Sequence, residues 1–222
     1  DEARRALAEL AEQEPELCAV LGETVGDSWR DAYKEHFKPF ALTPSLTVVP
    51  PWVDYQPRPG ESVMWMDPGR AFGTGLHATT ALVALEIERH RRCLAGTVVL
   101  DVGTGSGILA IAALLLGATA AVAIDNDPEV IDVARENAAR NGLAGRLQVS
   151  TTAIEAVEGR YRFVVANIRA EVLGAMAGEL GRLLEPGGML VLSGVLASER
   201  DELVARYLAG GGLRDWSLIR RL

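Results

Sequence analysis

Two aspartates and a cluster of glycines are the residues whose types and spacing most clearly indicate chemistry. The stretch LDVGTGSGILA carries Gly103, Gly105 and Gly107, with Asp101 two residues before the first glycine. Glycines at such spacing let the backbone turn sharply and approach a ligand closely, because no Cβ atoms stand in the way. Glycine turns open many α/β helices, so the loop predicts a ligand-binding turn without naming the ligand.

The acids around this loop narrow the choice of ligand. A dinucleotide-binding turn has its third glycine where this chain has Ile108, and a carboxylate at Asp101 would repel a pyrophosphate but attract a cationic amino-acid group. Asp125 ends the next apolar run, where its two oxygens can accept hydrogen bonds from both hydroxyls of a ribose. We therefore predict S-adenosylmethionine as the cofactor in preference to a nicotinamide cofactor. The plain alternatives are that Asp101 is an exposed turn or helix-cap carboxylate and that Asp125 is a solvated residue at a strand end.

A second glycine-containing stretch, DPGRAFGTGLHATT (residues 67–80), precedes a helical pattern. It lacks the lysine and the following serine or threonine of a phosphate-binding P-loop. Its histidine, His77, has no neighbouring partners, whereas a metal site needs three or four ligands. We therefore predict no metal and interpret His77 as a loop residue with a satisfied hydrogen bond.

The elements that must position these residues alternate regularly after residue 96. Short β-branched runs predict strands, and helical patterns of about 10–15 residues lie between them. We expect strands over 97–103, 120–125, 146–151, 161–168, 187–194 and 213–221, and helices over 106–117, 128–142, 170–184 and about 197–209. Asp127 and Pro128 supply the second of these helices with a cap and a first residue. Such alternation predicts an α/β fold with an open, doubly wound, mostly parallel sheet of Rossmann-like type.

The first 62 residues have a different character. Residues 1–21 are rich in Ala, Leu and Glu at helical spacing, and prolines then punctuate short runs such as LTVV up to residue 62. We expect a short helical and extended appendage over residues 1–62 and the main domain over 63–222.

The composition is that of a globular protein with an acidic balance. Of 222 residues, 49% are hydrophobic and 23% are charged, and the net charge is −8. An acidic surface repels phosphates, so we expect no general grip on nucleic acid. Cys18 and Cys93 lie far apart in the sequence, which favours a reducing, cytoplasmic compartment. The apolar run GILAIAALLLGATAAVAI is broken by glycines and is interpreted as a buried helix and strand, not a membrane span.

Several stretches together closely resemble the ribosomal protein L11 methyltransferase family (PrmA). They are WRDAYKEHFKPFALTPSLTVVPPW, WMDPGRAFGTGLHATT, DVGTGSGILAIAALLLGA, DNDPEVIDVARENAARNG, VVANIRAEVL and PGGMLVLSGVL. The resemblance covers about residues 28–222, and residues 65–80 are its most specific part, because plain class I methyltransferases lack that stretch. It implies a class I methyltransferase fold and an enzyme that methylates lysine side chains and the N-terminal amine of one ribosomal protein. S-adenosylmethionine would be the methyl donor and S-adenosylhomocysteine the product.

The resemblance also implies roles for particular residues. The family's cofactor contacts carry over onto Thr80, Gly103, Asp125 and Asn167, whose residue types match. Asn167 would also face the transferred methyl group, at a strand end where many N-methyltransferases carry Asn-Pro-Pro-aromatic and this chain has Asn-Ile-Arg-Ala. The complete predicted cofactor site adds the acid and glycine of the first turn and the family's closing loop: Asp101, Gly105, Phe72, Gly73 and Thr74.

Two departures from the family bear on the substrate. Family members usually carry an N-terminal domain of about sixty residues that grips the ribosomal protein, whereas ~28 residues precede the shared segment here, too few for an independent domain. The end of the chain is also shorter than the family's usual hairpin. A lysine methyltransferase of another protein, a nucleic-acid or small-molecule N-methyltransferase and a non-catalytic scaffold remain as alternatives. We expect a monomer with a protein substrate.

Overall fold

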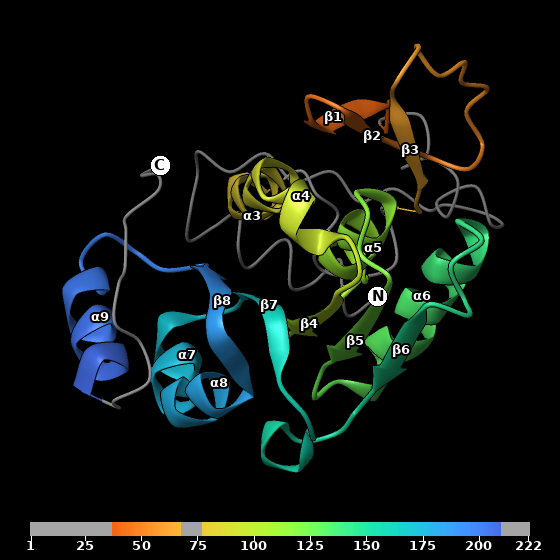
Figure 1. The fold of residues 1–222 in the computed structure, drawn as a ribbon. Helices are drawn as coiled ribbons and strands as arrows, with labels where there is room; N and C mark the ends of the chain where they lie inside the picture. The colour runs from red at the N-terminus through yellow and green to blue at the C-terminus, as the bar shows by residue number, and fades with distance from the viewer. Residues whose placement is uncertain (1–36, 68–76, 210–222) are drawn as a thin grey trace, which may run out of the picture. The chain divides into compact units, whose positions relative to one another are not determined.

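The computed structural model describes residues 37–67 and 77–209. The chain divides into two compact units, Asp1–Phe37 and Lys38–Leu222, and the elements described below belong to the second (Figure 1). The expected domain boundary between residues 62 and 63 stays a prediction.

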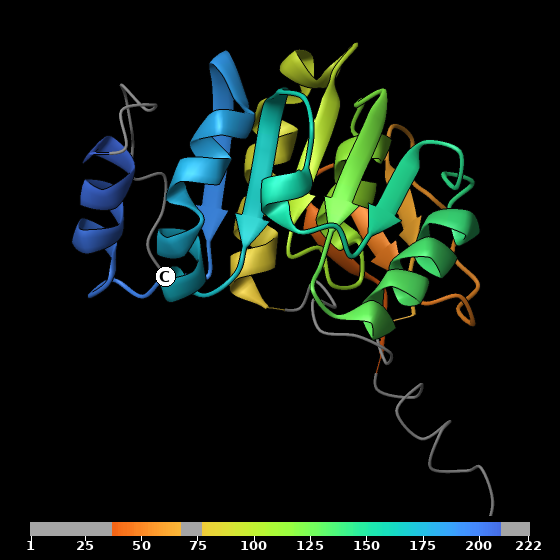
Figure 2. The same cartoon turned by 90° about the horizontal axis from the view of Figure 1, so that it is seen from below.

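A parallel sheet forms the centre of this unit. Its strands in the described part of the chain are ordered β6-β5-β4-β7-β8, and each neighbouring pair is parallel. They are β4 (Val98–Val102), β5 (Ala120–Ile124), β6 (Leu147–Ser150), β7 (Tyr161–Asn167) and β8 (Leu184–Ser193). The carboxyl ends of the strands therefore lie at one edge of the sheet (Figure 2). The strand order reverses at β4, and open α/β sheets bind their ligands at such a switch point.

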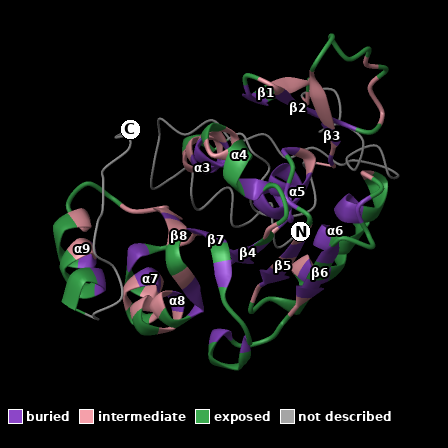
Figure 3. Cartoon of the chain, in the orientation of Figure 1, coloured by how far each residue is buried: buried purple, intermediate pink, exposed green. Residues whose placement is uncertain are grey.

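Alternate residues of the strands face two separate apolar cores, because successive strand side chains point to opposite faces. In β4, Val99 lies in one core and Leu100 in the other. The first face is covered by α3 (Ala78–Arg89), α5 (Ile108–Leu115) and α6 (Pro128–Arg140), with α4 (Arg91–Leu94) following α3. The second is covered by α7 (Ala170–Ala175), α8 (Ala177–Leu183), α9 (Arg200–Ala209) and the 3-10 turn η2 (Ile154–Ala156). Figure 3 shows α5 buried along nearly its whole length, whereas α9 exposes its outer side. The predicted doubly wound α/β sheet is confirmed.

The sequence signals at helix starts act as expected. Asp127 caps α6 by accepting a hydrogen bond from the Glu129 N–H at 2.9 Å, and Pro128 is the first helical residue. Gly107 precedes α5 with a φ of 82°, in the left-handed region that favours glycine. Within residues 37–67 and 77–209, no helix is both long enough and apolar enough to span a bilayer.

The proline-punctuated segment forms a second, small sheet that packs on α3 and α5, the helices that cover the first face (Figure 1). Its strands are β1 (Phe40–Thr43), β2 (Leu46–Val49) and β3 (Ser62–Trp65); β1 and β2 are antiparallel, and β2 and β3 are parallel. Leu46 and Met64 share the apolar core of α3 and α5. The Asn141 side chain, just after α6, binds both backbone groups of Trp65: Oδ1 accepts from its N–H and Nδ2 donates to its carbonyl, each at 2.8 Å. The small sheet is thus fixed to the rest of this unit by packing and by polar contacts.

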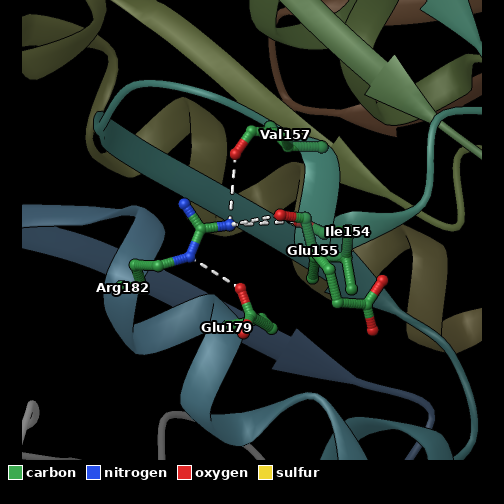
Figure 4. Close-up of polar contacts among 5 residues, drawn as sticks. All are labelled: Ile154, Glu155, Val157, Glu179 and Arg182. Carbon is green, nitrogen blue, oxygen red and sulfur yellow. Dashed lines mark hydrogen bonds and ion pairs between the residues drawn. The ribbon is translucent and has the colours of Figure 1, made fainter.

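The crossover from β6 to β7 is held by one side chain. Arg182 of α8 donates from Nη2 to the carbonyl oxygens of Ile154 at 3.2 Å and Val157 at 3.1 Å, and Nε donates to Glu179 at 2.6 Å (Figure 4). The side chains of Ile154 and Val157 are buried in the second core with Leu180. The guanidinium therefore gives the Val157 carbonyl a donor and the Ile154 carbonyl a second one, in addition to the Val157 N–H at 3.2 Å.

One expected helix needs correction, and one expected strand falls on residues that the structure does not describe. The single helix expected over residues 170–184 is wrong: α7 and α8 are separated at Met176 (φ −89°, ψ 2°), and Leu184 already belongs to β8. Glycine disfavours helix, and Gly174 lies close to this break. A Cβ on Gly174 would lie 3.3 Å from Cδ of Arg206 in α9. The strand expected over 213–221 lies outside the described residues.

Candidate active site

The glycine loop at residues 103–107 follows β4 and is bound to the end of β5. The N–H groups of Gly103 and Thr104 both donate to the Ile124 carbonyl, at 2.9 and 3.1 Å. Gly103 and Gly105 have φ angles of 74° and 52°, which residues with a Cβ rarely adopt. The predicted sharp turn is confirmed, and both glycines are needed for its backbone conformation.

Helix α6 holds the far end of the loop. A Cβ on Gly107 would lie 3.1 Å from the Ala134 Cβ, so loop and helix are in close contact. Asn137, which is buried in α6, donates from Nδ2 to the Ser106 carbonyl at 2.9 Å, and Arg140 donates to the Asn137 Oδ1 at 2.8 Å. The loop is therefore held in place by contacts with α6.

Asp101 is fully buried where β4 meets the loop. Its Oδ2 accepts hydrogen bonds from the Thr104 hydroxyl at 2.7 Å and from the Ala110 N–H, in the first turn of α5, at 3.1 Å. Within the described residues, no group donates to the other oxygen, Oδ1. The exposed-turn alternative is therefore wrong, whereas the helix-cap alternative holds for one oxygen. A buried polar atom without a partner is rare and costly, so Oδ1 marks a place where a donor on a ligand would be stabilised.

Burial also changes the acidity of Asp101. Desolvation raises its pKa to about 6, the negative charge of Asp125 adds to the rise, and the hydrogen bonds from Thr104 and Ala110 oppose it. At neutral pH the carboxyl group is mainly ionised. It therefore offers a buried negative charge to a cation.

Asp125, at the end of β5, is half-buried and is held by the backbone on both sides. Its Oδ2 accepts from the Gly105 N–H at 2.9 Å, and its Oδ1 accepts from the Asp127 N–H at 3.1 Å. A carboxylate has about four acceptor positions, so each oxygen retains capacity for a hydroxyl donor. The alternative of a merely solvated strand-end residue is wrong, because these bonds tie the carboxylate to the glycine loop.

An amide group lies at the end of the neighbouring strand. On β7, Phe163, Val165 and Asn167 alternate onto the face that α3 covers. Nδ2 of Asn167 donates to the hydroxyl oxygen of Thr80 at 3.2 Å, which joins residues 87 positions apart. Thr80 lies in the first turn of α3 and is buried. Because Nδ2 faces Thr80, the amide oxygen Oδ1 is the atom that can accept a hydrogen bond from a ligand.

The start of α3 is held from both sides. His77 is its cap, and Nδ1 accepts from the Thr79 N–H at 3.4 Å and lies 2.7 Å from the Thr79 hydroxyl. The Ser193 hydroxyl, at the end of β8, donates to the Thr79 carbonyl at 3.4 Å. His77 is thus the satisfied loop residue that we predicted. In the part of the chain that the structure describes, no three His, Cys, Asp or Glu residues are placed to hold a metal.

The structure brings most of the sequence-predicted residues to one edge of the sheet. Hydrogen bonds join Gly105 to Asp125 and Thr80 to Asn167, and the paired strands β4 and β7 place the two groups side by side. Phe72, Gly73 and Thr74 lie outside the described residues. The sequence reasoning missed Thr104, whose hydroxyl donates to Asp101.

Comparison with known proteins identifies the family. The sequence model of the family described as "Ribosomal protein L11 methyltransferase (PrmA)" matches residues 2–217. The chain belongs to this family. The family match begins at residue 2, whereas the resemblance was expected to begin near residue 28. The expected departure in the N-terminal domain stays a prediction.

Members of the ribosomal protein L11 methyltransferase family resemble the chain over most of its length. A protein of that name from Sorangium cellulosum (strain So ce56) is 64% identical over 207 residues, which are 93% of this chain and 65% of the relative. One from Pelobacter propionicus is 44% identical over 92% of this chain and 68% of the relative. The crystal structure of a ribosomal protein L11 methylase from Lactobacillus delbrueckii subsp. bulgaricus is 37% identical with a TM-score of 0.72, and the match covers 78% of this chain and 89% of that one. The doubly wound sheet is therefore a methyltransferase fold, and the chain spans about two thirds of the length of these curated relatives.

Proposed function

We propose that the chain is an S-adenosylmethionine-dependent protein N-methyltransferase. Its substrate would be ribosomal protein L11, modified on lysine side chains, on the N-terminal amine, or on both. The observation that carries the proposal is the Asn167 amide, held by Thr80 beside a glycine loop to which the carboxylates of Asp101 and Asp125 are hydrogen-bonded. The names of the relatives support L11 as the substrate.

The residues at this edge fit S-adenosylmethionine. Asp101 would hold the cationic amino group, because its buried Oδ1 has no donor among the described residues. Asp125 would accept the ribose hydroxyls with the lone pairs that Gly105 and Asp127 leave unused. Thr80, Gly103 and Phe72–Thr74 are proposed as further contacts. When bound, the cofactor supplies a methyl group on a positively charged sulfur, which makes that methyl group an electrophile.

The chain's own task is then to present a neutral amine. A lysine with its ordinary pKa of about 10.4 is charged at neutral pH and has no lone pair to attack with. We propose that the lysine ammonium first gives its proton to water. Oδ1 of Asn167 then accepts a hydrogen bond from an N–H of the neutral amine and so orients its lone pair toward the methyl carbon, whose bond to sulfur breaks as the new N–C bond forms. Correct orientation of two reacting groups supplies a large part of the rate of such reactions.

The charge of the chain suits a protein substrate. A net charge of −8 disfavours nucleic acid and favours a basic partner. The proposal includes the remaining expectations: a monomer that acts in the cytoplasm without a grip on nucleic acid.

A labelling experiment tests the proposal. The 222-residue chain is incubated with methyl-labelled S-adenosylmethionine and purified L11, or with L11 that has been acetylated on all its amines, and labelled sites are located by mass spectrometry. We expect label on amines of unmodified L11 and none on the acetylated protein, with Asn167→Ala as the inactive control. Cofactor binding without label on L11, or label on ribosomal RNA added in parallel, would overturn the proposal.

A further inference from the structure

The residue that follows Asn167 is packed between two glycines. A Cβ added to Gly103, which follows β4, would lie 2.2 Å from Cγ2 of Ile168. Gly194, after β8, lies where a Cβ would be 2.6 Å from the carbonyl oxygen of Ile168 and 3.1 Å from its carbonyl carbon. Both glycines also have positive φ angles, of 74° and 82°. Ile168 is thus in close contact with the glycine loop through its side chain and with the end of β8 through its backbone.

This packing bears directly on the amide next to it. β7 lies between β4 and β8, with Ala166 beside Val102 and Asn167 beside Ser193. The Ile168 side chain packs against the second core, whereas the Asn167 side chain reaches Thr80 at the first face. The two side chains extend from consecutive residues to opposite faces of the sheet. A shift of Ile168 would therefore rotate the peptide that carries Asn167.

We propose that Ile168 is a positioning residue for methyl transfer, because its contact with Gly103 fixes the position of the Asn167 amide relative to the glycine loop. The inference rests on the proposed function of Asn167. A β-branched side chain suits this role, since its χ1 angle is restricted and its Cγ2 is held firmly against the loop. Ile168 touches neither reactant in this proposal and acts through Asn167.

Three single variants separate positioning from plain packing. Ile168→Ala removes the contacting Cγ2, Ile168→Val retains the β-branch and loses the δ-methyl group, and Leu190→Ala truncates another partly buried residue of the second core. We expect Ile168→Ala to lower kcat by about 10- to 100-fold, because a misplacement of about 1 Å can lower the rate by about 100-fold. The Kd of S-adenosylmethionine should change less than about threefold. Ile168→Val should retain kcat within about threefold. Leu190→Ala should lower the melting temperature with no comparable loss of kcat.

An NMR measurement, which needs no turnover, reports directly on the side-chain amide of Asn167. The side-chain NH2 resonances of Asn167, identified by their loss in Asn167→Asp, should shift in Ile168→Ala and stay in place in Ile168→Val and Leu190→Ala. Failure of wild-type protein to methylate L11 would count against the proposed function, whereas these resonances would still show whether Ile168 positions Asn167.

Double variants test the contact. Gly103→Ala should lower the urea midpoint of unfolding, and adding Ile168→Ala should recover part of that loss, because the side-chain clash is removed. Gly194→Ala should show no such recovery, because its Cβ meets the backbone of Ile168, which truncation leaves in place. If Gly103→Ala does not fold, the inference is tested by kcat and the Asn167 resonances of Ile168→Ala and Ile168→Val alone. Unchanged kcat and unchanged Asn167 resonances in Ile168→Ala would overturn the inference.

Discussion

Two regions meet at the carboxyl edge of the sheet and are fixed by different means. The acid region consists of Asp101, the glycine loop at residues 103–107, and Asp125; the amide region consists of Thr80, Asn167 and Ile168. In the acid region, carboxylates accept hydrogen bonds from groups at most 20 residues away. In the amide region, one neutral hydrogen bond of 3.2 Å spans 87 residues, and the rest is close packing against glycines.

The difference separates binding from reaction. Charge-assisted hydrogen bonds are strong and local, so the acid region is formed by one βαβ segment and should govern the affinity for the cofactor. The amide region depends on how α3 and β8 dock beside β7, so it should govern the orientation of the reacting amine. Substitutions in the first region should change Kd, and those in the second should change kcat.

The largest effect is expected in the amide region. Asn167→Ala removes the proposed acceptor for the amine and should lower kcat at saturating substrates by about 100-fold, since orientation is lost. The Kd of S-adenosylmethionine, measured by calorimetry, should rise by a clearly smaller factor than kcat falls, although Asn167 is also a predicted cofactor contact. A loss of affinity as large as the loss of kcat would contradict the separation of the two regions.

The acid region should show its effect through pH. Burial raises the pKa of Asp101 from 3.8 to about 6, so the folded protein binds a proton between these values that the unfolded chain releases. This group therefore lowers the free energy of unfolding as pH rises from about 4 to 6, by up to about 3 kcal/mol at about 1.4 kcal/mol per pKa unit. Asp101→Asn should lack this slope.

Urea unfolding of both proteins at pH 4, 5, 6 and 7 checks the prediction, since other titrating groups contribute equally to each. The wild-type protein should lose stability relative to Asp101→Asn as pH rises. Over the same range its affinity for the cationic cofactor should increase, because the carboxylate becomes ionised. Parallel stability curves would show that Asp101 does not titrate in this window.

Asp125→Ala should weaken cofactor binding by about 10-fold or more, because a hydrogen bond to a charged group contributes about 1.5 kcal/mol or more. At saturating cofactor, kcat should be close to that of the wild-type protein. Asp127→Ala is the matched control: it removes the cap of α6 and should cost about 1 kcal/mol of stability without a change in Kd. Equal Kd values for the two variants would contradict the assignment of Asp125.

The smallest effect should come from the opposite edge of the sheet. Arg146 donates to the carbonyl oxygens of Ala118 and Thr119, just before β5. Arg146→Ala should lower the free energy of unfolding by about 1–2 kcal/mol, because these carbonyl groups lose their donor. Neither Kd nor kcat should change by more than about twofold. A larger kinetic change would mean that loss of stability alone disturbs the site.

Local signals predicted much of the acid region. Asp127, Pro128 and the later Gly142 mark both ends of α6, and the structure follows them, with a φ of 69° at Gly142. The period of two in β4 also places Asp101 on the same face as Val99, from which its burial was predictable. Such inferences succeed because each depends on residues close together in the sequence.

The amide region was predictable only in part. A resemblance to a family selected Thr80 and Asn167, but their contact depends on how α3 docks on β7, which no local pattern specifies. Ile168 looks like any apolar residue that ends a strand, and its close fit against Gly103 and Gly194 depends on three strands at once. The division of the expected helix at Met176 had a visible cause in its glycines, yet the approach of α9 at Gly174 was not visible.

Arg182, which donates to carbonyl groups of the β6–β7 crossover, also affects the order in which the protein can fold during translation. β4, β5 and β6 are complete when residue 150 has been made, but the carbonyl group of Val157 finds its donor 25 residues later, on Arg182. Leu100 and Ile124 likewise share the second core with side chains of α7, α8 and α9, and β4 gains its second neighbour only when β7 has been made. A nascent chain that ends before α8 therefore exposes an apolar sheet face and an open strand edge, the surfaces from which aggregation starts and which chaperones recognise.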